Sequence, residues 1–156
     1  MTPAFVLAHT IPAALSLLPA KMDTPAALAM LLAIGLQESK FQHRTQVQGP
    51  ARGYWQFEEQ GGVMGVLTHR QSAALSVTVC DALGYVPTPN GAFPAIADND
   101  VLACAFARLL LWTLPDALPT TAVEGWAQYL AAWRPGRPHP ETWAGNWAKA
   151  LETMHE

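Results

Sequence analysis

The chain has 156 residues and a formal net charge of -3; apolar residues make up 51% of it and charged residues only 13%. That length suits one domain with a sizeable core and is too short for two comfortable ones. A slightly acidic chain with so few charges has no basic face for DNA or RNA, which excludes nucleic-acid binding. We therefore expect a single, compact, mainly α-helical domain over residues 1–156.

Two helix-start patterns lie in the first quarter of the chain. Thr2-Pro3 and Thr24-Pro25 each place a threonine N-cap before a proline at the first helical position. The first helix is expected to bend or stop near Pro12 and to resume until Pro19. The second is predicted to form a central apolar helix that ends near Lys40.

The apolar N-terminal segment, residues 1–18, has two interpretations of about equal weight. It covers the central helix, or it is a docking arm for other proteins. Residues 1–20 lack the basic start of a signal peptide. The apolar run at residues 25–36 is shorter than the ~18 residues that a membrane-spanning helix needs. We therefore expect neither a signal peptide nor stable membrane insertion.

The central helix carries an acidic residue at its end. Leu31, Ile34 and Glu38 fall on one helical face, so the carboxyl group continues an inward-pointing apolar stripe. Burial disfavours the charged form and raises the pKa of a carboxyl group. A carboxyl that stays protonated near neutral pH can act as a general acid. The alternative is that Glu38 only closes the helix, with its carboxylate in solvent.

A polar, glycine-rich stretch over residues 42–62 follows. It predicts an irregular loop or a short β-hairpin around Tyr54–Phe57. A helix is then expected from about Thr68 to Leu83, with Gly84 as its C-terminal stop. The three prolines in Tyr85–Ala97 indicate a connector.

The second half of the chain predicts three more elements. Asp98-Asn99-Asp100 caps an apolar helix that should run through the middle of the domain and end by Pro115. Thr121 and Glu124 form a capping box for a helix carrying Trp126, Tyr129 and Trp133. The last helix begins at about Glu141. Cys80 and Cys104 lie in apolar helical patterns, which favours buried free thiols, although a disulfide stays open.

Two segments together resemble the lysozyme-like superfamily, in its lytic transglycosylase and goose-type lysozyme branch. Glu38-Ser39 ends a helix, and Gly53-Tyr54-Trp55-Gln56-Phe57 follows after a loop, as in that branch and its phage-encoded members. The resemblance implies a lysozyme-like α+β fold with Glu38 as the catalytic acid/base. It also implies a substrate cleft at Gln56, lined by Ser39, Gly53, Tyr54 and Trp55. Trp55 is the best sugar-contact candidate, because flat aromatic faces pack against pyranose rings.

A late helix in this branch usually carries a Tyr-Asn pair followed by Gly, and the Tyr positions the catalytic Glu. Here Trp133 and Arg134 stand in that frame. An indole N–H can donate a hydrogen bond, but it lacks the acceptor of a phenol. Tyr129, one turn earlier, is the other candidate to close the cleft from this helix.

A second carboxylate would decide the mechanism, and Glu58 and Glu59 are the nearest candidates. Retaining and inverting glycosidases differ in the spacing of two carboxyl groups. The alternative is that both are solvated loop residues. The resembled branch often works with Glu alone, which yields an anhydro product and needs neither a metal nor a cofactor.

These residues predict an enzyme that cleaves the β-1,4 glycan strands of peptidoglycan. It would be a phage virion component or an endolysin released from the host cytoplasm to the cell wall. One rival is a structural virion protein that keeps the fold, contacts other phage proteins and has little or no activity. Another is a sugar-binding module that keeps Trp55 and dispenses with Glu38.

Overall fold

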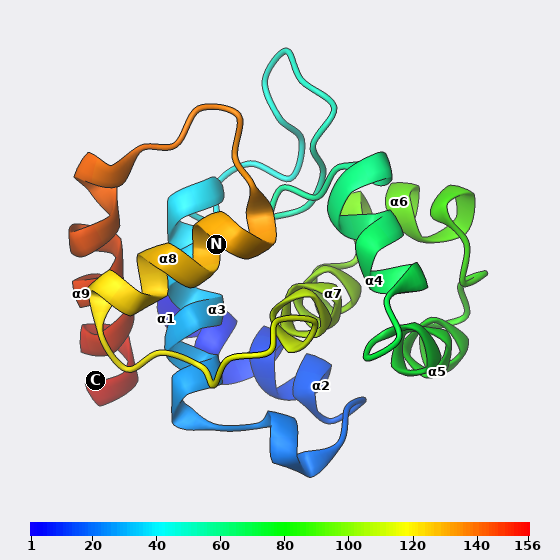
Figure 1. Ribbon diagram of the computed structural model, residues 1–156, viewed down its shortest axis with the longest axis horizontal. Helices are drawn as coiled ribbons and strands as arrows, with labels where there is room; N and C mark the ends of the chain where they lie inside the picture. Colours follow the sequence, from blue (N-terminus) through cyan, green and yellow to red (C-terminus); the bar gives the residue numbers. More distant parts are fainter.

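Two apolar helices, α3 (Pro25–Glu38) and α7 (Asp100–Trp112), form the centre of the molecule (Figure 1). The computed structural model describes residues 1–156. Thr24 caps α3 by accepting from the N–H of Ala27, and Asn99 caps α7 through Leu102. Every residue from 102 to 111 is buried, so the prediction of an apolar helix through the middle of the domain is confirmed. The mainly α-helical fold class is confirmed as well.

The N-terminal segment is one nearly continuous helix, formed by α1 (Pro3–Phe5), the π-helix η1 (Val6–Thr10) and α2 (Ile11–Leu15). The helix does not stop at Pro12, although it changes from a π-helix to an α-helix directly before that residue. The N–H of Ile11 donates to the carbonyl of Val6, five residues back, which is the wider turn of a π-helix. The helix continues through Pro12, which has no backbone N–H to donate. After Leu15 the chain turns into the 3-10 helix η2 (Ala20–Met22).

This segment belongs to the core. Its fully or almost fully buried side chains pack largely against α7; they are Val6, Ile11, Ala14, Leu15 and Leu18. The segment is therefore part of the core and not a free docking arm, but it packs mainly on α7 and only through η1 on α3, the helix that it was expected to cover.

Three helices form a side lobe: α4 (Met64–Thr68), α5 (Ala73–Leu83) and α6 (Pro89–Asp98). The helix expected from Thr68 to Leu83 thus begins later, at Ala73, and it ends at the left-handed Gly84 as predicted. The expected connector is largely helical, because Thr88 accepts from the N–H of Gly91 and caps α6. Cys80 and Cys104 are buried and free.

The loop after α3 contains two isolated antiparallel bridges, Thr45 with Arg52 and Arg52 with Phe57, and no strand. The β-hairpin considered for this segment is therefore absent. Arg44 fastens the loop to the start of α7 through two hydrogen bonds to Asp100, of 2.9 and 2.8 Å. The short π-helix η3 (Glu59–Val63) then leads into α4.

The last two helices, α8 (Ala122–Trp133) and α9 (Pro140–His155), cover the other side of α3 (Figure 1). Thr121 caps α8, as the capping box predicts. α9 packs along α3 with Trp143 and Trp147 buried on its inner face. None of the helices combines the length and apolar character needed to cross a membrane.

Candidate active site

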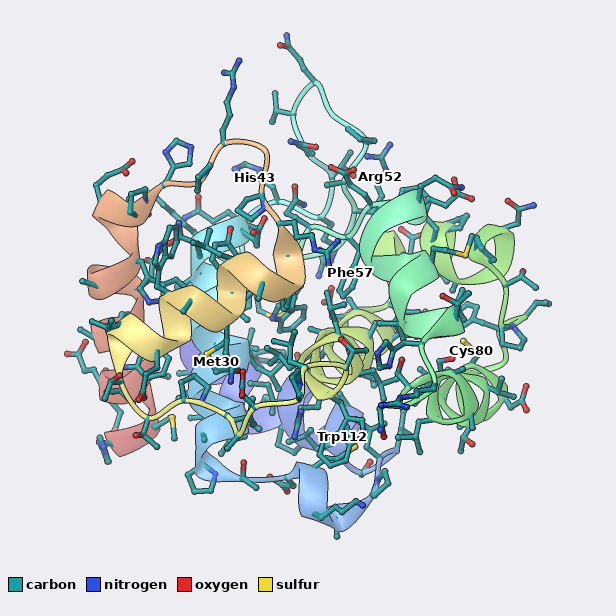
Figure 2. All side chains as sticks on the ribbon, in the orientation of Figure 1. Met30, His43, Arg52, Phe57, Cys80 and Trp112 are labelled. Atoms are coloured by element: carbon teal, nitrogen blue, oxygen red, sulfur yellow. The ribbon has the colours of Figure 1, made fainter.

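A cleft of about 1000 Å³ lies at the C-terminal end of α3. The loop after α3, the end of α8 and the turn before α9 form its walls. Its polar and charged lining residues are Gln37, Glu38, His43, Gln46, Gln56, Glu58, Gln60, His69, Thr113, Tyr129, Arg134, Arg137 and His139. Figure 2 labels two of the lining residues, His43 and Phe57, and places Phe57 between α8 and α4. His43 is exposed, whereas Phe57 is buried.

Glu38 meets Tyr129 in this cleft. The phenol of Tyr129 donates a hydrogen bond of 2.5 Å to Oε1 of Glu38. Burial raises the pKa of Glu38 from 4.5 to about 7; the Tyr129 hydrogen bond lowers it and the charge of Glu58 raises it. Desolvation is the largest of these effects, so the inward stripe of α3 is what keeps the carboxyl protonated into the neutral range. Glu38 is half-buried and faces the cleft, which favours the inward-pointing interpretation over that of a carboxylate in free solvent.

Ser39 fastens the end of α3 to the Gly53–Phe57 segment. Its buried hydroxyl lies 2.7 Å from the carbonyl oxygen of Tyr54 and 3.3 Å from that of Gly35. The same oxygen accepts from the N–H of Phe41 at 3.1 Å. Ser39 does not line the cleft, so its placement disfavours the predicted substrate contact. Its hydrogen bonds instead hold the turn that follows Glu38.

The aromatic residues of the motif point inward. Tyr54 and Trp55 are 3% and 0% exposed, and the indole N–H of Trp55 donates to the carbonyl of Leu31 at 2.9 Å. Gly53, at a φ of 74°, is pressed against Ile96. None of these three residues lines the cleft: Trp55 packs beneath α3, and Gly53 packs against α6 and α7. Their placement in the interior therefore disfavours the expected substrate contact of Gly53, Tyr54 and Trp55.

Gln56 and Trp133 do lie in the cleft wall, as predicted. Gln56 holds its side chain by donating to the carbonyl of Gly53 at 2.8 Å. Trp133 donates its indole N–H to the carbonyl of Trp55 at 2.8 Å, which ties α8 to the motif loop. Its half-buried ring remains available to a ligand, while its one donor is already used.

Gln37 is a cleft residue that the sequence reasoning missed. Its Oε1 accepts from Asn146 at 2.7 Å and from Thr142 at 3.1 Å, and its Nε2 donates to the carbonyl of His139 at 3.0 Å. It therefore fixes α9 and the turn before it beside Glu38. An amide directly before the acidic residue is the one signal that the sequence offered.

Of the two candidate second carboxylates, Glu58 lines the cleft and Glu59 does not. No group of three or more His, Cys, Asp or Glu residues is placed to hold a metal ion. No protein-family model matches the chain, and neither a curated protein nor a solved structure does. The chemistry of the cleft is therefore inferred from its own residues and from the two motifs.

Proposed function

We propose that the chain cleaves the β-1,4 glycan strands of peptidoglycan, as a lytic transglycosylase or a lysozyme-type glycosidase, with Glu38 as the acid/base. The observation that carries this proposal is a carboxyl group with a pKa of about 7 in an open cleft of about 1000 Å³. A general acid works best when its pKa lies near the operating pH. The cleft is also large enough to admit part of a polymer chain. A carboxylate with only a structural role would need no such opening.

The hydrogen bonding of Glu38 suits a proton donor. Tyr129 occupies Oε1, while Oε2 has no hydrogen-bond partner within the protein. In this proposal Oε2 carries the proton and delivers it to the leaving glycosidic oxygen. The Tyr129 hydrogen bond then stabilises the carboxylate that is left, because a bond to the charged form favours it.

The second step has two forms. In the first, the Glu38 carboxylate takes a proton from a hydroxyl of the sugar itself, and an anhydro product results. In the second, a water attacks with help from Glu38 or Glu58, and the product has a reducing end. Glu58 faces the same cleft, so both forms are compatible with the residues present.

Tyr129 also bears on the replacement of the Tyr-Asn pair of the resembled branch by Trp133-Arg134 in this chain. The resembled branch relies on a late-helix tyrosine to position its glutamate, and here a tyrosine one turn earlier makes that contact. This supports an active enzyme over a structural virion protein that merely keeps the fold. Delivery from a virion, or release from the host cytoplasm to the cell wall, remains part of the proposal.

Product analysis on purified peptidoglycan tests the proposal. We expect soluble glycan fragments from the unchanged chain, none from Glu38→Gln, and undiminished release from Glu59→Gln, the matched carboxylate outside the cleft. Anhydro ends would identify a transglycosylase and reducing ends a lysozyme. A folded, unchanged chain that releases neither product would favour the structural alternative.

A further inference from the structure

A second hollow, of about 780 Å³, lies at the C-terminal end of α7, separate from the Glu38 carboxyl. It is formed by the start of α3, the turn between α4 and α5, and residues 111–118. Trp112, labelled in Figure 2, is the last residue of α7 and lines this hollow. Three cations line it, Lys21, Arg70 and Arg108, together with His69, against a single acidic residue, Asp116. Such a balance is unusual in a chain whose net charge is -3.

Arg108 is the most informative of these residues. It is only 2% exposed, and its single protein hydrogen bond runs from Nε to the carbonyl of Met22 at 2.9 Å. Nη1 is buried without any hydrogen-bond partner, and no carboxylate forms an ion pair with the guanidinium. A buried cation normally needs a counter-charge and satisfied donors, because desolvation otherwise opposes its burial.

The ring of Trp112 contacts two cations of this hollow, Arg108 and Lys21. Cζ of Arg108 and Nζ of Lys21 each lie 5.3 Å from the centroid of the Trp112 ring. The ring attracts both charges, yet it supplies no acceptor for their N–H groups. Two cations therefore lie against the ring of one tryptophan at this hollow, and Nη1 of Arg108 has no hydrogen-bond partner.

We propose that this hollow binds a small oxyanion, the carboxylate or phosphate group of a small molecule, on Arg108 and Lys21. Guanidinium N–H groups match the paired oxygens of both anions, and a charge-assisted bond would satisfy the donors that the fold leaves free. His69, Thr113 and Leu114 line this hollow and the Glu38 cleft alike. These shared residues would thus separate the bound anion from the Glu38 cleft. This placement does not depend on which reaction the cleft performs.

The test is a titration of the whole chain with inorganic phosphate, and separately with acetate, against sodium chloride at matched ionic strength. The reporter is the ¹⁵N–¹H resonance of Arg108 Nε, which we expect to shift saturably with phosphate or acetate and not with chloride. The anion that saturates at the lower concentration identifies the chemistry of the ligand.

Three variants locate the site. Lys21→Gln changes an exposed residue and should weaken anion binding several-fold, whereas Lys149→Gln, an exposed cation on α9, should leave it unchanged. Arg108→Lys keeps the positive charge but loses the paired N–H donors of the guanidinium. We expect it to weaken anion binding by about ten-fold or more, because charged hydrogen bonds are lost. Equal shifts with chloride, or unchanged binding in Lys21→Gln, would overturn the proposal even if Arg108→Lys failed to fold.

Discussion

Glu38 is the residue whose titration should govern activity. As the proton donor it must be protonated, so the rate should fall as the pH rises through its pKa of about 7. Glu58→Gln removes a charge that raises this pKa and should move the alkaline limb of the pH–rate profile to lower pH. Tyr129→Phe removes a hydrogen bond that lowers it and should move the limb to higher pH. Profiles of peptidoglycan cleavage check both.

Glu58→Gln and Tyr129→Phe should shift the alkaline limb in opposite directions, which makes their comparison informative. Glu59→Gln, whose carboxyl lies outside the cleft, is the matched control and should leave the limb in place. A limb that shifts in the same direction in Glu58→Gln and Tyr129→Phe would contradict the assignment to Glu38.

The same pKa links Glu38 to stability. Its folded value of about 7 exceeds the usual 4.5, so the folded state binds the proton more tightly and loses stability as the pH rises from about 4.5 to about 7. This difference in pKa corresponds to a change of about 3 kcal/mol in the free energy of unfolding. Glu38→Gln, which cannot ionise, should match the unchanged chain near pH 4 and exceed it by up to about 3 kcal/mol at pH 8. Urea unfolding at both pH values measures this, and an equal difference at both would refute it.

At the scale of elements, two helical glycines offer a matched comparison. A Cβ at Gly35 in α3 would lie 2.2 Å from the ring of Phe41, which is fully buried, whereas a Cβ at Gly145 in α9 would meet nothing within 4 Å. Gly145→Ala should stabilise the protein by about 0.5–1 kcal/mol through helix propensity. Gly35→Ala should destabilise it by about 1–3 kcal/mol through overpacking. Thermal unfolding compares the two, and the same sign for both would contradict the packing at Gly35.

The helix starts show what local patterns can and cannot predict. Thr24-Pro25 correctly predicts α3, and Thr88-Pro89 is the same pattern at the start of α6. The prolines near the second pattern nevertheless favour a connector in a reading of the sequence. Pro94 inside α6 removes only one backbone hydrogen bond, and burial of Ala92 and Ile96 against the core outweighs that loss.

The candidate site was predictable where it depended on one helical face. Periodicity alone places Glu38 at the end of an inward stripe. The choice between Trp55 and Trp133 as the cleft aromatic depends on the backbone, since Gly53 and Gln56 on either side of Trp55 both adopt positive φ, at 74° and 51°. A glycine can be expected to do so, a glutamine cannot. That turn sends Trp55 into the core and leaves the cleft wall to Trp133.

At the scale of the whole molecule, the N-terminal segment should be indispensable. Deleting residues 1–18 would remove five buried side chains from the single hydrophobic cluster and uncover α7. Removing even one large buried side chain costs about 2–5 kcal/mol, which approaches the total stability of a domain. We expect the truncated chain to lack cooperative unfolding by circular dichroism. A folded truncated chain would restore the docking-arm interpretation.

The buried cysteines have a consequence for measuring motion in this domain. Burial raises the pKa of the Cys80 thiol to about 11, and that of Cys104 rises further, so neither presents a reactive thiolate at neutral pH. Alkylation must therefore wait for a transient opening. Cys80 lies in α5 of the side lobe and Cys104 in central α7, so the first labelling rate reports detachment of the lobe and the second reports disruption of the core. The chain thus contains two internal reporters that can time these openings separately, without any added probe site.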